Sequence, residues 1–429
     1  MSQSRQVWGW ALYDWANSAF ATTVMAGFFP VFFKEFWSAG ADITVSTARL
    51  GLANSMASTM VALLAPVLGA IADRGTAKKK FLMFFAYMGV VMTASLTLVS
   101  KGNWGWAVLL YALATIGFSG ANVFYDALIS LVSSKKRMDF VSTLGFSLGY
   151  LGGGLLFAVN VWMALSPGTF GFADAGQAIR FSYLMVAFWW AVFSVPVFLF
   201  VREPRRKEKP SALKAVREGL AELTGTIQEI RHLRMLVLFL VAYWLYMDGV
   251  HTVIRMAVDY GISIGFQSKD LIVALLITQF VGFPAALLFG YMGGKIGAKR
   301  ALFIGIGVYL FVCVWAAFMR STHEFFVLAM VVGLVQGGIQ ALSRSYYAKI
   351  IPVEKSGEYF GFYNMMGKFA AVLGPALMGM VGLLIRSMGY SSNAASRGSI
   401  TSIALLFLAG GVLLFLVREE NGQGAQKNP

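Results

Sequence analysis

The segment REPRRKEKPSALKAVREGLAELTGTIQEIRHLR, from Arg202 to Arg234, is the longest polar stretch of the chain. Long apolar runs follow one another on both sides of it, so the segment divides the chain into two apolar halves. This pattern predicts an amphipathic helix lying on the membrane surface, and a solvated tether is the alternative. The apolar residues that recur within it at helical spacing are Leu213, Val216, Leu220, Leu223, Ile227 and Ile230.

The composition of the whole chain argues against a water-soluble fold. Of 429 residues, 58% are hydrophobic and 13% are charged, against roughly 45–50% and about 25% in soluble proteins. One crossing of a ~30 Å hydrocarbon core takes about 20 apolar residues. We therefore predict an all-α polytopic membrane protein with twelve transmembrane helices, near residues 8–37, 47–72, 79–100, 104–133, 138–165, 181–201, 234–264, 270–293, 298–319, 322–349, 357–385 and 399–418.

The positions of the basic residues predict the orientation of these spans. With both chain termini in the cytoplasm, 25 Lys and Arg residues lie on the cytoplasmic side, Arg344 and Lys349 among them, and 8 lie on the other side. This asymmetry follows the positive-inside rule. The net charge of +15 then reflects orientation and contact with anionic lipid head groups, and no nucleic acid is expected as a partner.

The scarce cysteine and histidine residues give no support for a metal site. The single cysteine, Cys313, can neither close an intrachain disulfide nor build a thiolate site alone, and the three histidines have no metal-binding spacing. A nucleotide-binding P-loop is not found, and neither is a combination of nucleophile, base and orienting group. We therefore expect no metal, no cofactor and no enzymatic activity.

The sequences that follow the second and the eighth predicted spans are similar. GAIADRGTAKKK runs from Gly69 to Lys80, and GYMGGKIGAKR runs from Gly290 to Arg300. Each places glycines where helices must approach closely and ends in a basic cluster. Repeated halves are typical of secondary transporters, which bind their substrate near the midplane between the halves.

Longer motifs extend this similarity to a known family. The repeated loop resembles the signature loop of the major facilitator superfamily, and nearly the whole chain resembles the vacuole effluxer branch of that superfamily. The motifs that carry the resemblance are YDWANSAFAT from Tyr13, FYDALIS from Phe124, LGYLGGGLL from Leu148, FWWAVFSVPVFLFVREP from Phe188, DGVHTV from Asp248, SRSYYAKIIP from Ser343 and GEYFGFYNMMGKFAAVLGP from Gly357.

The resemblance implies two pseudo-symmetric six-helix bundles that rock about a central cavity. Their boundaries would be residues 1–201 and 234–429, with the cytoplasmic linker 202–233 between them. In this superfamily the first, fourth, seventh and tenth spans line the cavity. Fungal members of the branch are linked to amino-acid release from the vacuole, while many bacterial relatives have no assigned substrate.

The resemblance also implies that Gly69, Asp73 and Arg74 form a gate that latches the halves in one state. A local helix cap combined with a topology signal is the alternative. The loop departs from the family pattern, because Thr76 stands where glycine is expected and Gly294 replaces the acid in the second copy. We therefore expect the gating role to be stronger in the first half.

Charged and amide side chains recur on one face of the first, fourth, seventh and tenth predicted spans. A charge at mid-bilayer costs about 2.5–3.5 kcal/mol, and lipid cannot satisfy polar groups, so these faces should point at one another or at water. A shared polar cavity follows. The residues predicted to bind substrate or protons there are Asp14, Asn17, Asn122, Asp126, Asp248, His251, Arg255, Gln336 and Gln340, joined by Asn364 and Lys368 on the eleventh span.

Asp14 and Asp126 are predicted to lie at the same depth. At 1.5 Å per residue, each lies roughly 10 Å from the cytoplasmic end of its span. Two carboxylates this close would titrate as a unit, which predicts a proton-binding pair. The alternative is that Asp14 is a structural ion, stabilised by the helix dipole and by Asn17.

The seventh span carries two acids that have different neighbours. Asp248 and Arg255 are about 10 Å apart along the axis, whereas Arg255 and Asp259 are four residues apart and can pair. Asp248 is then available to an ammonium group, a proton or Lys368, and Arg255 or Lys368 can bind a carboxylate. An internal ion-pair network is the alternative, and for His251 we favour a neutral, hydrogen-bonded state.

These observations favour a secondary active transporter that moves a small polar solute out of the cell, with an amino acid as the suggested cargo and protons as a suggested coupling ion. The alternatives are efflux of drugs or lipids, and a non-transporting receptor with a transporter fold. We expect a monomer, with membrane lipids and the small-molecule substrate as its partners. The expected location is the inner (plasma) membrane of a bacterium.

Overall fold

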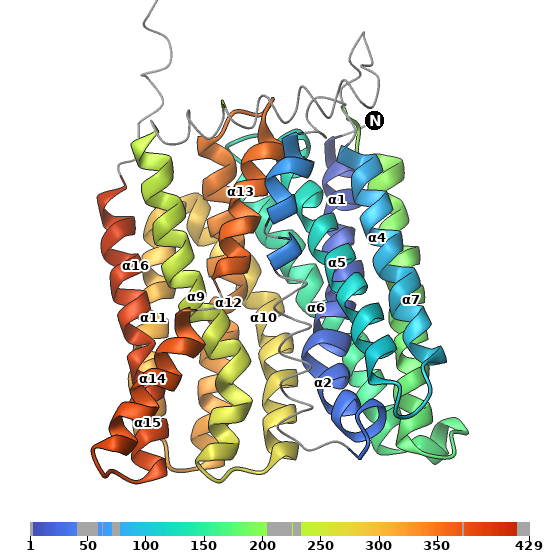
Figure 1. Cartoon of the computed structure of the whole chain (residues 1–429). Coiled ribbons are helices and arrows are strands. Elements are labelled where there is room, and N and C mark those ends of the chain that lie inside the picture. Colours follow the sequence, from blue (N-terminus) through green and yellow to red (C-terminus); the bar gives the residue numbers. More distant parts are fainter. Residues whose placement is uncertain are drawn as a thin grey trace, which may run out of the picture.

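The computed structural model describes residues 3–40, 59–61, 63–70, 78–203, 225, 233–370 and 373–417. Throughout these residues the regular structure is helical, and the long helices run side by side in opposite directions (Figure 1). The start of α1 and the end of α16 lie at the same end of the bundle, at the top of Figure 1. We call this end the terminal face and the other end the opposite face.

The first half of the chain forms the bundle on the right of Figure 1. Its first crossing begins as α1 (Gln3–Ala19), continues as a π-helix (Phe20–Phe28), and ends with α2 (Phe29–Phe32) and a second π-helical turn (Phe33–Trp37). The helices that follow are Thr59–Ala70, α4 (Lys78–Ser95), α5 (Trp104–Val132), α6 (Met138–Leu165) and α7 (Ala175–Phe200).

The second half forms the bundle on the left of Figure 1. Its eleventh crossing is broken after Phe369, so that two helices replace one continuous span. The helices of this half are α9 (Arg234–Ser263), α10 (Ser268–Ile296), α11 (Ala298–Phe318), α12 (Thr322–Ile350), α13 (Ser356–Phe369), α14 (Leu373–Ser387), α15 (Ser392–Ser402) and α16 (Ala404–Leu416).

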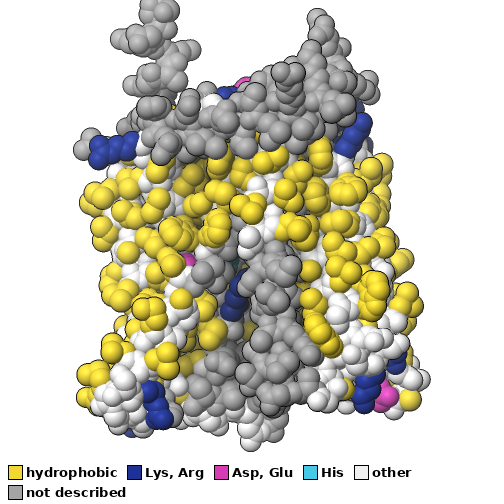
Figure 2. Space-filling model, viewed as in Figure 1, with side chains coloured by type: hydrophobic (Ala, Val, Ile, Leu, Met, Phe, Trp, Pro, Cys, Tyr) yellow, Lys and Arg dark blue, Asp and Glu magenta, His cyan; other side chains and the backbone are white. Residues whose placement is uncertain are grey.

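The described part of the chain contains 9 helices that are long and apolar enough to cross a membrane. The other three predicted spans correspond to the interrupted first crossing, to the helix Thr59–Ala70, and to α13 with α14. On the face seen in Figure 2, apolar side chains form a broad band, and most of the visible Lys and Arg side chains lie toward the two ends. This arrangement confirms an integral, multi-pass membrane protein.

Glycines of the repeated sequence bring the two halves into close contact. A Cβ at Gly69 would overlap the carbonyl oxygen of Gly357 at the start of α13, and a Cβ at Gly290 would overlap Thr143 of α6. Gly69 and Gly290 occupy the same place in the two copies of the repeat. The prediction that these glycines permit close approach is therefore confirmed, and both contacts lie across the interface between the halves.

The linker helix predicted around residues 213–230 lies outside the described residues, as do Asp73 and Arg74. The boundaries of the bundles therefore remain a prediction. α9 begins at Arg234, which is where the second bundle was expected to begin.

Candidate functional site

A buried arginine of the second half contacts two aspartates of the first half. Arg344 lies on α12, and its side chain is 3% exposed. One terminal nitrogen lies 3.1 Å from Oδ1 of Asp126 on α5, and the other lies 3.4 Å from Oδ2 of Asp14 on α1. The two carboxylates that the sequence placed at one depth therefore share a single guanidinium. We call these three side chains the Arg344 cluster.

The remaining surface of the guanidinium is also occupied. Nε of Arg344 donates to Oγ of Ser142 at 2.9 Å, and a terminal nitrogen donates to the backbone oxygen of Ser142 at 2.8 Å. The guanidinium lies within 4.8 Å of the ring centroid of Trp10 and within 4.4 Å of that of Phe146. The hydroxyl of Tyr125 donates to Asp14 at 2.7 Å. Arg344 is thus fixed by hydrogen bonds and aromatic rings together, a setting that suits arginine better than lysine.

Amide side chains extend the cluster as the sequence predicted. Nδ2 of Asn364 on α13 donates to Oδ2 of Asp126 at 3.2 Å. Within the first half, Nδ2 of Asn17 donates to Oδ1 of Asn122 at 2.7 Å. Helices α1, α5, α12 and α13 therefore meet at one polar centre that lies between the halves.

The sequence prediction did not include Arg344 in the site, because it counted this residue only among the basic residues of the cytoplasmic side. Arg344 lies within α12, six residues before its end, and is buried. The sequence nevertheless contained a feature that placed Arg344 with the predicted site residues. The tenth span was predicted to reach residue 349, and Arg344 follows Gln340 by four residues, which places both near one helix face.

A second polar contact joins the halves nearer to the terminal face. Nζ of Lys349 on α12 lies 2.6 Å from Oδ2 of Asp139, in the first turn of α6, and Oγ of Ser345 donates to the other carboxylate oxygen at 2.7 Å. At the start of α4, Nζ of Lys78 donates to Oγ of Ser356 at 3.1 Å. With the Arg344 cluster, these contacts join the two halves in two layers on the side of the terminal face.

Asp248 is placed differently from what the sequence suggested. Its side chain is fully buried and accepts hydrogen bonds from the backbone amides of Leu373 at 2.9 Å and Gly374 at 2.8 Å, the first residues of α14. On the next turn of α9, Nδ1 of His251 lies 2.6 Å from the carbonyl oxygen of Ala370. Asp248 therefore caps α14, the helix that follows the break, and the binding of a solute by Asp248 remains a prediction.

Replacing Asp248 by alanine should lower stability, because two amides of α14 would lose their acceptor in a buried position. A loss of about 1–2 kcal/mol is expected, as for other helix caps. The apparent Tm of the purified protein measures it, with Arg234→Gln, an exposed position at the start of the same helix, as the control that should not change Tm. An unchanged Tm combined with lost transport would indicate that Asp248 binds the solute and does not serve only as a helix cap.

The other predicted site residues are dispersed along their helices. Arg255 is exposed on α9, and Gln340 is half-buried on α12. Gln336 contributes to an apolar cavity inside the second half. Lys368 belongs to α13, but its side chain lies outside the described residues, as does that of Asp259.

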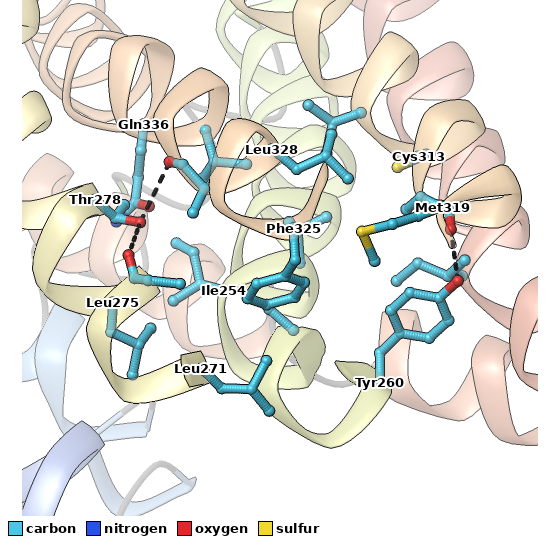
Figure 3. A pocket seen from close by; sticks show the side chains of 18 residues that line it. Ile254, Tyr260, Leu271, Leu275, Thr278, Cys313, Met319, Phe325, Leu328 and Gln336 are labelled. Carbon is cyan, nitrogen blue, oxygen red and sulfur yellow. Dashed lines mark hydrogen bonds between the residues drawn. The ribbon is translucent and has the colours of Figure 1, made fainter. Parts of the chain in front are cut away.

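The apolar cavity lies inside the second bundle, among α9, α10, α11, α12 and α15, and has a volume of about 80 Å³. Figure 3 shows Leu271, Leu328 and Phe325 at its wall. The polar groups of the wall are paired: Oγ1 of Thr278 donates to the carbonyl oxygen of Ala274 at 2.9 Å, and the hydroxyl of Tyr260 donates to that of Ala316 at 2.6 Å. Such a cavity favours apolar groups.

Comparison with known proteins identifies the family. Residues 2–140 and 131–427 match the family model described as "Vacuole effluxer Atg22 like". The chain is 40% identical over 419 residues to the uncharacterized MFS-type transporter YxiO of Bacillus subtilis (strain 168), covering 97% of this chain and 96% of that protein. It is 21% identical over 452 residues to autophagy-related protein 22 of Eremothecium gossypii, covering 90% and 87% of the two chains.

Solved structures show the same fold at low sequence identity. The proton:xylose symporter XylE matches with a TM-score of 0.70 and 14% identity, over 97% of this chain and 95% of that chain. The human organic anion transporter MFSD10 (TETRAN) matches with a TM-score of 0.71 and 16% identity, over 96% and 98%. The chain therefore belongs to the vacuole effluxer Atg22-like family of the major facilitator superfamily of membrane transporters.

Proposed function

We propose that this transporter moves a small polar solute by alternating access, with the Arg344 cluster as the lock that closes the terminal face. The observation that carries the proposal is the contact of one buried guanidinium in the second half with two carboxylates in the first half. Rocking the halves apart at this face separates these charges, so the contact contributes free energy to one state only. A ligand that replaces it changes the balance between the states.

The terminal face is assigned to the cytoplasm in this proposal. The asymmetry of Lys and Arg residues supports the assignment through the positive-inside rule. The location proposed is the plasma membrane of a bacterium, as suggested by the relative in Bacillus subtilis.

The solute proposed is one that carries a carboxylate, with amino acids as the first class to test and efflux as the direction. When the terminal face opens, Arg344 loses its partners in the first half, and its guanidinium can bind a carboxylate through two hydrogen bonds. The exposed Arg255 on α9 offers a second cation. The description of the family as vacuole effluxers and that of the human neighbour as an organic anion transporter agree with this choice.

Proton coupling is proposed for the same cluster. Two carboxylates face one guanidinium, which leaves one negative charge in excess when both acids are ionised. A proton on either acid removes the excess and weakens the contact with Arg344. Proton binding would in this way favour the opening of the terminal face.

The test of the function is counterflow in proteoliposomes across a panel of amino acids, with an imposed pH gradient as the second variable. Accumulation of a labelled amino acid against unlabelled substrate, increased by the gradient, supports the whole proposal. Counterflow without an effect of the gradient removes proton coupling. Counterflow with none of the panel removes amino acids as the cargo.

Replacing Asp126 by asparagine should weaken transport driven by a pH gradient and preserve exchange that does not depend on pH. The amide keeps the hydrogen-bonding shape but cannot take up a proton. The matched control is Asp174→Asn, because Asp174 caps α7 at an exposed site and asparagine caps a helix equally well. Wild-type pH dependence in the Asp126 variant would contradict the proposed proton site.

A second candidate is the efflux of apolar or amphipathic compounds. The apolar cavity in the second bundle, with Phe325 and Met319 among its lining residues, favours it. Counterflow with amphipathic dyes separates the two candidates, since a polar-solute carrier should not exchange them.

A further inference from the structure

A groove on the opposite face, separate from the Arg344 cluster, carries two arginines. It lies between the end of α11 and the helix α15 and is open to the surface. Its lining contains no carboxylate. The residues that line it are Ala317, Phe318, Arg320, Ala394, Arg397, Gly398 and Thr401.

Arg397 is held at the edge of this groove by two hydrogen bonds. Its Nε donates to Oδ1 of Asn393 and one terminal nitrogen donates to the carbonyl oxygen of Ala317, both at 2.6 Å. These bonds use two of the five N–H donors of a guanidinium. The side chain is therefore positioned in advance, with donors left for a ligand.

Arg320 adds a second positive charge to the groove. Its side chain is exposed, just beyond the end of α11. The nearby carboxylate of Glu324 interacts electrostatically with Arg320, and its Oε2 accepts from the amide of Arg320 at 2.5 Å and from that of Ser321 at 3.1 Å. Glu324 is in this way engaged in capping α12. The two guanidiniums together suit an anion with several oxygen atoms.

The groove lies at the edge of the apolar belt. Arg397 is four residues inside the candidate span Asn393–Leu416, or about 6 Å along its axis. On the outer surface of α11, large side chains stand exposed on one face, from the groove toward the middle of the helix: Phe318 is 73% exposed, Val314 is 48% exposed and Phe311 is 55% exposed. An anion bound between the arginines would therefore be adjacent to a lipid-facing apolar stripe.

We propose that this groove binds the head group of an anionic phospholipid, with the phosphate between Arg320 and Arg397 and an acyl chain along Phe318, Val314 and Phe311. Guanidinium and phosphate match in charge and in hydrogen-bonding geometry. The apolar stripe distinguishes a lipid from free phosphate, because an inorganic anion gains nothing from it. The site is independent of the transported solute.

The test uses the full chain in detergent, titrated with phosphatidylglycerol and followed by native mass spectrometry. Each basic residue near a membrane surface contributes about 1 kcal/mol to the binding of an anionic lipid, so Arg320→Gln/Arg397→Gln should bind the most tightly held lipid about 30-fold more weakly. Arg320→Gln alone should bind it about fivefold more weakly, and it leaves the hydrogen bonds of Arg397 in place. The matched control is Arg386→Gln, which removes a charge from α14 outside the groove and should bind like the wild type.

Two further binding measurements identify the chemical class of the ligand. Phosphatidylcholine should not replace phosphatidylglycerol, and inorganic phosphate at millimolar concentration should not displace it. Equal binding by the wild type and by both groove variants would overturn the proposal. Displacement by inorganic phosphate would overturn it as well, and would indicate a site for free anions.

Discussion

Replacing Arg344 by glutamine is expected to abolish gradient-driven transport. The substitution leaves Asp14 and Asp126 buried without their common counter-charge, and removal of one partner from a buried ion pair costs about 3–5 kcal/mol. Most of this penalty falls on the state with a closed terminal face, where the three groups meet. The population of that state should fall about 100- to 1000-fold relative to the open state.

The change in the population of the closed state can be measured as a distance between the two halves. Spin labels at Lys135→Cys and Glu354→Cys, both exposed near the terminal face, report it in a Cys313→Ser background, since Cys313 is the only native cysteine. The distance should increase in Arg344→Gln and remain as in the wild type in Arg300→Gln, an exposed arginine at the start of α11. Retained transport with an unchanged distance would contradict the lock.

If Arg344→Gln does not fold, a further variant separates loss of folding from loss of the lock. Removing all three charges, with Asp14→Asn, Asp126→Asn and Arg344→Gln, avoids an unpaired ion. Neutral replacement of a buried ion group is often tolerated, so the triple variant should regain stability while its transport no longer responds to pH.

Replacing Gly69 by alanine is expected to prevent the terminal face from closing. The added methyl would overlap the carbonyl oxygen of Gly357 and would lie 3.0 Å from Cα of Glu358, and backbone cannot yield as a flexible side chain can. Overpacking of this kind costs about 1–3 kcal/mol, which corresponds to a loss of the closed state of about 5- to 150-fold. Transport should fall accordingly, while the open state stays folded.

Gly294 supplies the matched control for this substitution. It belongs to the corresponding loop of the second half, and a Cβ there would meet nothing within 4 Å. Gly294→Ala should therefore leave both transport and the spin-label distance unchanged. Equal behaviour of the two variants would remove the gating role that the family resemblance assigned to Gly69.

The architecture was largely predictable from the sequence, because hydropathy over about 20 residues measures the same burial in lipid that determines a span. The breaks in the first and eleventh crossings could not be predicted from hydropathy. Residues 20–28 are as apolar as an unbroken helix, and hydropathy carries no information on which backbone hydrogen bonds form.

Part of the polar centre was also predictable. Asp14 and Asp126 were expected at one depth from their distance to the helix ends, and one guanidinium contacts both. The role of Asp248 could not be predicted, since its partners are backbone amides more than a hundred residues away, and nothing in their side chains marks them. A buried acid that caps a helix and a buried acid that binds a solute look alike in sequence.

The break in the eleventh crossing has a mechanical consequence. Asp248 and His251, adjacent turns of one unbroken helix, hold the two sides of the break. Because α9 forms hydrogen bonds with residues on both sides of the break, we expect α9, α13 and α14 to move together. A movement of any of these three helices would then displace Asn364, and through its hydrogen bond it would displace Asp126.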